Sequence, residues 1–195
     1  SHMHILLIED ELALADEICQ SLRKANYAVS HLSSGKQAIV AAQNGDFDLM
    51  ILGSSEKGFG LKKEIHIWLS RDELDNANLM ILIAYIVMGH PEWKDGTINI
   101  FAFFPEEELA KEKERIIEMT STGRLPISAN NIKVIAQEDG IPEKMLIQKY
   151  SNDADLTLVG FGDNDILKEA TEVFKGYESL GNVLFVNSAK EKEIK

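Results

Sequence analysis

Short apolar runs recur along this chain, and segments with the spacing of amphipathic helices separate them. These runs are rich in Val, Ile, Leu and Phe, and several are continuously apolar, as is typical of parallel strands that helices cover on both faces. They predict eight strands, at residues 4–8, 28–33, 49–52, 64–70, 98–104, 132–137, 156–161 and 183–187.

The segments between the strands carry helical signals. Leu14, Ile18 and Leu22 share one helix face. Residues 79–88 are the most apolar stretch and predict a buried helix, because about 20 apolar residues are needed to cross a bilayer. Another helix is expected after Pro105, where a run of glutamates suits a helix N-terminus.

Because strand and helix alternate, we expect an α/β fold: a doubly wound, mostly parallel sheet of about eight strands with helices on both faces. In such sheets ligands bind at the carboxyl ends of the strands. Ser1-His2-Met3 reads as a tag remnant, and residues 190–195 as a frayed tail.

Composition narrows the function classes. The 32 acidic residues outnumber the 20 Lys and Arg, giving a net charge of -12 that repels nucleic acid. The single cysteine allows no disulfide within the chain, which favours a reducing compartment. With neither a signal peptide nor a membrane-spanning segment recognised, we expect a cytoplasmic protein that does not insert into the membrane.

A carboxylate pair, Glu9 and Asp10, follows the first strand. Hard cations such as Mg²⁺ prefer oxygen ligands, so these residues are a candidate for a weak magnesium site. The same residues also fit an acidic helix entry with Asp10 as N-cap and no metal. The sequence leaves both interpretations open.

The first fifty residues resemble a response-regulator receiver domain of the transcription-factor type. The match covers residues 4–53, the first three strands and two helices of that family, and in that family the acidic pair helps bind Mg²⁺. The phosphorylated aspartate should follow the third strand, but Gly53 stands there. Glycine has no nucleophile, so we expect no phosphotransfer and no catalytic residue.

From Glu56 onward the chain resembles the cytosolic C-terminal domain of cation-chloride cotransporters of the sodium-potassium-chloride type. The features that carry this resemblance are Ile65-His66-Ile67-Trp68, Gly89-His90-Pro91-Glu92-Trp93 and the strand at 155–160. The resemblance covers residues 54–189. It implies a regulatory and dimerising domain with a universal-stress-protein-like fold and without catalysis, tethered in the parent protein to a membrane domain. A homodimer is among the assembly states that this resemblance implies.

For three smaller features a purely structural interpretation competes with a functional one. Gly160-Phe161-Gly162 lies where some universal stress proteins bind ATP, but Asp163 and Asp165 follow, and a plain strand-to-helix turn is favoured. We expect His66 and His90 to be structural, with a His90 imidazolium suiting a helix end. We therefore expect no cofactor other than Mg²⁺ bound weakly at Glu9 and Asp10.

Two family resemblances meet near Gly53, and the receiver-like part ends halfway through its own fold. Its third strand would leave an open sheet edge unless it pairs with a strand of residues 54–189, in one continuous sheet. The sequence therefore favours a non-enzymatic, engineered chimeric scaffold joined at Gly53. The alternatives are a natural regulatory and dimerisation module of a cotransporter, or a switch that responds to phosphate or nucleotide.

Overall fold

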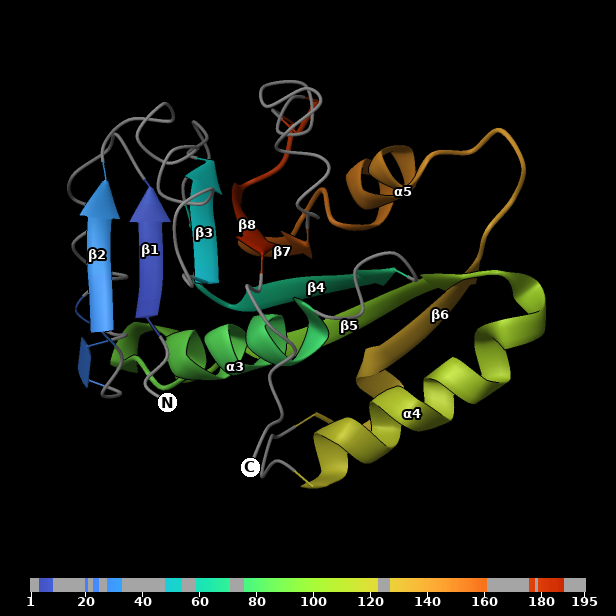
Figure 1. Ribbon diagram of the computed structural model, residues 1–195, viewed down its shortest axis with the longest axis horizontal. Coiled ribbons are helices and arrows are strands. Elements are labelled where there is room, and N and C mark those ends of the chain that lie inside the picture. The colour runs from blue at the N-terminus through green and yellow to red at the C-terminus, as the bar shows by residue number, and fades with distance from the viewer. Residues whose placement is uncertain are drawn as a thin grey trace.

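In the computed structural model, strands and helices alternate around one sheet (Figure 1). The structure describes residues 4–8, 20, 23–24, 28–32, 48–53, 59–70, 76–122, 127–160, 176–177 and 179–187. Its strands are β1 His4–Ile8, β2 Ala28–Leu32, β3 Asp48–Gly53, β4 Glu64–Ser70, β5 Thr97–Phe104, β6 Ile132–Ala136, β7 Leu156–Gly160 and β8 Asn182–Asn187.

These strands form an eight-stranded sheet in the order β2-β1-β3-β8-β7-β4-β5-β6. Five neighbouring strands, from β8 to β6, run parallel, and β2, β1 and β3 are parallel to one another. The two sets meet where β3 pairs antiparallel with β8, with Gly53 opposite Val183. The expected α/β class and mostly parallel sheet are confirmed.

The chain enters the five parallel strands in the middle. It runs from β4 through α3 (Ala77–Met88) to β5, and through α4 (Leu109–Thr122) to β6 at the edge. It then returns through α5 (Glu143–Tyr150) to β7, on the other side of β4. Figure 1 shows α5 on the opposite face of the sheet from α3 and α4, so this part is doubly wound.

Residues of β4 alternate between the two faces. Ile65, Ile67 and Leu69 belong to the main apolar core with α3, whereas His66 and Trp68 point to the α5 face. The continuous apolar pattern of β4 arises because both faces are covered: residues 65–70 are all buried.

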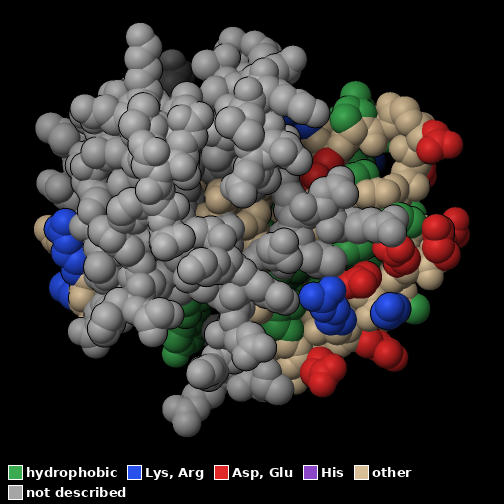
Figure 2. Space-filling view, in the orientation of Figure 1, with side chains coloured by type: hydrophobic (Ala, Val, Ile, Leu, Met, Phe, Trp, Pro, Cys, Tyr) green, Lys and Arg blue, Asp and Glu red, His purple; other side chains and the backbone are tan. Residues whose placement is uncertain are grey.

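The short 3-10 helices lie at element ends: η2 Pro91–Trp93, η3 Glu106–Glu108 and η4 Ala129–Asn131. The glutamates of η3 precede α4, as their helix-entry pattern predicted. Figure 2 shows Asp and Glu side chains gathered at the right-hand end of the molecule, over α4 and the loop after β6. The charge of this face is thus mainly acidic in the part that the structure describes.

Candidate functional site

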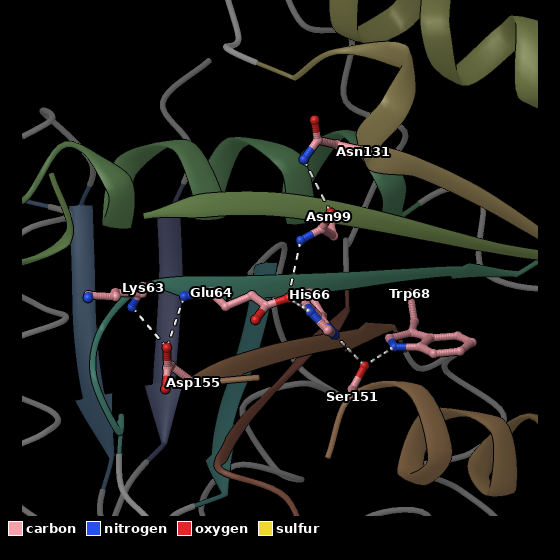
Figure 3. Close-up of polar contacts among 8 residues, drawn as sticks. All are labelled: Lys63, Glu64, His66, Trp68, Asn99, Asn131, Ser151 and Asp155. Carbon is pink, nitrogen blue, oxygen red and sulfur yellow. Dashed lines mark hydrogen bonds and ion pairs between the residues drawn. The ribbon is translucent and has the colours of Figure 1, made fainter. Parts of the chain in front are cut away.

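The strand order reverses between β4 and β7, which is where open α/β sheets most often bind ligands at the carboxyl ends. These ends are Ser70 and Gly160, and the residues that follow both of them lie outside the described part of the chain. The polar cluster that the structure does describe lies toward the amino ends of the same strands (Figure 3).

Hydrogen bonds link four of its side chains in one line. The indole Nε1–H of Trp68 donates to Ser151 Oγ at 2.8 Å, and Ser151 Oγ lies 2.8 Å from His66 Nδ1. His66 Nε2 lies 2.7 Å from Glu64 Oε1. Because the carboxylate can only accept, His66 donates from Nε2–H, and in the neutral imidazole Nδ1 then accepts from the Ser151 hydroxyl.

Burial keeps His66 in that neutral form. Its exposed fraction is 4%, and removal from water lowers the pKa of the imidazole below its usual value of 6.5, against the opposing effect of the Glu64 carboxylate. Lys133 also lowers this pKa, and Asp155 raises it. With the imidazole neutral, Trp68, Ser151 and His66 all donate in the same direction along this line, toward Glu64.

The serine, the histidine and the carboxylate follow one another in the order of a hydrolase triad, but their surroundings differ. Ser151 has no exposed surface, and its oxygen already accepts the Trp68 indole. A nucleophile must reach its substrate, and this hydroxyl has no open side. Since Ser151 is the C-cap of α5, the line instead fastens the end of that helix to β4.

The cluster continues from Glu64 toward the edge of the sheet. Asn99 Nδ2 donates to Glu64 Oε1 at 3.4 Å, and Asn131 Nδ2 donates to Asn99 Oδ1 at 3.2 Å. These residues come from β4, β5 and the turn before β6, so side-chain hydrogen bonds join the starts of three neighbouring strands. The side chain of Glu64 is 41% exposed, which places this part of the cluster at the surface.

Asp155 organises the loop that leads into β4. Its carboxylate accepts backbone N–H groups of Leu61 at 3.1 Å, Lys63 at 2.9 Å and Glu64 at 2.9 Å. Gly60 adopts a φ of +53°, and a Cβ there would lie 2.2 Å from Asp155 Oδ1. Glycine is therefore needed for both the left-handed backbone and the close approach of the carboxylate.

The two histidines that were expected to be structural make structural contacts, and so do the tryptophans Trp68 and Trp93. His66 has partners on both ring nitrogens, and Trp68 is fully buried, as expected of core residues. Trp93 is buried and packs edge-on against Phe59. His90 is the N-cap of η2, and its Nδ1 accepts the Glu92 N–H at 3.3 Å.

Of the other positions that the sequence singled out, the structure describes only some. Gly53, expected directly after the third strand, is instead its last residue, and it pairs with Val183 of β8. Glu9 and Asp10, the candidate magnesium ligands, lie outside the described residues, as do Phe161 and Gly162. Among the described residues, no group of three or more His, Cys, Asp or Glu side chains is placed to hold a metal.

Two residues central to the cluster, Ser151 and Asp155, were not singled out from the sequence. Asp155 directly precedes β7 and Ser151 lies a few positions earlier, in a polar turn that looks like an ordinary loop. The turn signal was present, but the partners are more than eighty positions away along the chain. Only the fold brings them together.

No protein family profile and no curated protein matches this chain. Among solved structures, the cytoplasmic domain of a prokaryotic cation chloride cotransporter is similar, with a TM-score of 0.59, 11% identity and 98% of each chain covered. A Pseudomonas aeruginosa protein assigned to the universal stress proteins overlays at a TM-score of 0.49 and 17% identity, covering 95% of this chain and 82% of that one.

The similarity to the cotransporter domain extends across Gly53, because it covers nearly the whole of both chains. It therefore shows a shared fold on both sides of the expected junction. It gives no support to an engineered chimera or to a receiver fragment ending at Gly53. None of the helices in the described ranges is long and apolar enough to cross a membrane.

Proposed function

We propose that this chain is a non-catalytic cytoplasmic regulatory module of a cation-chloride cotransporter. The observation that carries the proposal is the end-to-end similarity, over 98% of both chains, to the cytoplasmic domain of a prokaryotic cotransporter. A chimeric origin is not part of the proposal, since the similarity to that domain extends across Gly53.

The polar cluster supports a module without catalysis. The only described serine-histidine-carboxylate line ends in a hydroxyl with no exposed surface, and each of its groups is already hydrogen-bonded. The sequence features that resemble the cotransporter domain, Ile65 to Trp68 and Gly89 to Trp93, build strand β4 and the end of α3. Both segments therefore have structural roles in this fold.

A domain-replacement experiment tests this function. The chain would replace the cytoplasmic domain of a prokaryotic cation-chloride cotransporter, and chloride-dependent rubidium uptake would be measured in proteoliposomes. We expect more uptake than with the truncated transporter. A transporter carrying an unrelated α/β domain of similar size is the control, and uptake equal to the truncated form at equal protein level would contradict the proposal.

Self-association and ligand response provide a second test on the isolated chain. A regulatory module of this type is expected to form a homodimer, which sedimentation equilibrium would detect as a concentration-dependent mass. Titration with ATP, or with acetyl phosphate and Mg²⁺, is expected to leave the spectra unchanged. A saturable response to either ligand would favour a phosphate- or nucleotide-responsive switch over the regulatory module.

A further inference from the structure

The loop that leads into β4 directs three backbone N–H groups at one carboxylate. Leu61 N–H donates to Asp155 Oδ1 at 3.1 Å, whereas the N–H groups of Lys63 and Glu64 both donate to Oδ2, each at 2.9 Å. Figure 3 shows the two bonds to Oδ2. The carboxylate is thus held through both of its oxygens by backbone donors alone.

The backbone conformation of this loop produces the convergence. Gly60 and Lys62 have φ angles of +53° and +54°, in the left-handed region that a lysine rarely adopts. Lys62 N–H does not join the other three donors, because it donates to Phe59 C=O at 3.1 Å. Turns of this kind direct neighbouring N–H groups into a concavity that binds anions.

The distribution of donors selects the kind of anion. One oxygen accepts one N–H group and the other accepts two, so the site matches two acceptor atoms rather than one. A carboxylate carries two oxygens on a single carbon, whereas a halide is a single centre. The arrangement therefore fits a carboxylate better than a halide.

The strands that flank this site do not need the Asp155 side chain in order to pair. The backbone N–H of Asp155 donates to Glu64 C=O at 2.9 Å, and β7 pairs with β4 beyond it. Leu61 and Lys63 are exposed, so the loop is open to small ions from solvent. We therefore expect the site to persist, and to be accessible, when only the side chain is removed.

We propose that residues 60–64 form a carboxylate-binding site whose ligand in the folded chain is the Asp155 side chain, and that a free carboxylate ion binds there when this side chain is removed. The ligand class is a small monocarboxylate such as formate. In the wild-type chain the site is already filled, so it takes no external anion. This inference does not depend on the cotransporter proposal.

Chemical rescue of Asp155→Ala tests the proposal, because this change removes a group the size of formate. Thermal unfolding would be measured in sodium formate and in sodium chloride at equal concentrations. We expect formate, relative to chloride, to stabilise the variant saturably and more than it stabilises the wild-type chain. With formate at about ten times its dissociation constant, the melting temperature should rise by roughly 3–6 °C for a chain of this size.

Three further variants separate site binding from a general effect of the salt. Asp155→Asn keeps the site filled with an amide, whose NH₂ group cannot accept a hydrogen bond, so it should be destabilised without being rescued. Asp153→Ala, at an exposed position in the same turn, should not respond to formate. In Asp155→Gly acetate should rescue as well as formate, since its methyl group takes the space of the lost Cβ.

Several outcomes would overturn the proposal. One is an equal response to formate in Asp155→Ala, Asp155→Asn and the wild-type chain. If Asp155→Ala is unfolded in chloride, a circular dichroism spectrum that stays unfolded in formate is another. In the isotopically labelled variant we expect formate to shift the NMR signals of the Leu61, Lys63 and Glu64 amides most, and largest shifts elsewhere would place the ion at a different site.

Discussion

At the scale of single residues, His66 is the point where chemistry and packing meet. Its ring joins a hydroxyl on α5 to a carboxylate at the start of β4, and it also lies against the Phe101 ring, with centroids 4.9 Å apart. Lys133 and Asp155 act on it from β6 and from the loop before β7. A buried neutral imidazole in this position makes stability depend on pH.

We expect the chain to lose stability as pH falls below about 6.5. The unfolded chain takes up a proton at His66 near the usual pKa of 6.5, whereas burial lowers the pKa of this residue in the folded state. Between these two pKa values the unfolded state binds more protons, so the free energy of unfolding rises with pH. Below the folded-state pKa the loss levels off.

The variant His66→Gln isolates this contribution, because glutamine does not titrate. Urea unfolding of both proteins from pH 7.5 to 5 should show the wild-type advantage shrinking by up to about 1.4 kcal/mol per pH unit below 6.5. Other titrating groups affect both proteins alike. An advantage that stays constant over this range would show that His66 takes up no differential proton.

Ser151 should be coupled to Trp68 through their hydrogen bond. Ser151→Ala leaves the buried indole N–H without an acceptor, which costs about 1–3 kcal/mol of unfolding free energy. Once Trp68→Phe has removed that donor, the same serine change should cost less. A double-mutant cycle in urea measures the difference, and additive effects would argue against the donor line. Ser121→Ala, at an exposed position of α4, is the matched control, and we expect it to have little effect on stability.

At the scale of elements, the entry into β4 depends on a carboxylate from elsewhere in the chain. Asp155 precedes β7 and accepts two N–H groups of the loop before β4 and one from Glu64 at its start, while its own N–H donates to Glu64 C=O at 2.9 Å. These bonds fix the register at which two parallel strands begin. The tight turn at Gly60 is part of the same arrangement.

Gly60→Ala should therefore destabilise the fold more than Gly140→Ala. Both glycines have positive φ, +53° and +83°, so both variants carry the cost of a left-handed alanine, about 1–2 kcal/mol. A Cβ at Gly140 meets nothing within 4 Å, whereas one at Gly60 meets Asp155. Thermal or urea unfolding measures the two costs. Equal costs would mean that the loop shifts freely around Asp155.

At the scale of the whole molecule, the antiparallel pairing of β3 with β8 joins two parallel sets of strands into one sheet. All six residues of β8 are buried, and β3 covers its outer edge along five paired positions. Such a fully buried strand is a poor edge strand, because unpaired backbone groups and apolar side chains together promote association.

Removing residues 1–58 should expose that edge of β8 and cause the shortened chain to associate. Size-exclusion chromatography with light scattering would show larger species than for the full chain, together with a lower melting temperature. Removing residues 188–195 instead leaves every described strand in place and serves as the control. A truncated protein with the mass and melting temperature of the full chain would show that the β3–β8 pairing is dispensable.

Much of the fold could be predicted from local pattern. The continuous apolar runs located the strands to within one or two residues, and the glutamate run after Pro105 located the approach to α4. The site was harder to predict. His66 was recognised as structural because it alternates with isoleucines, but its partner Ser151 carries no local signal.

The sequence by itself determined the α/β class, the alternation of strands and helices, and the absence of a side chain at Gly53 that could accept a phosphoryl group. It could do so because periodicity and residue identity are local properties. Only the tertiary structure decided that β3 runs antiparallel to β8, that β6 is an edge, and that Trp68, Ser151, His66 and Glu64 form one line. These features depend on contacts between residues far apart in the chain, whose pairing is set by the packing of the whole sheet.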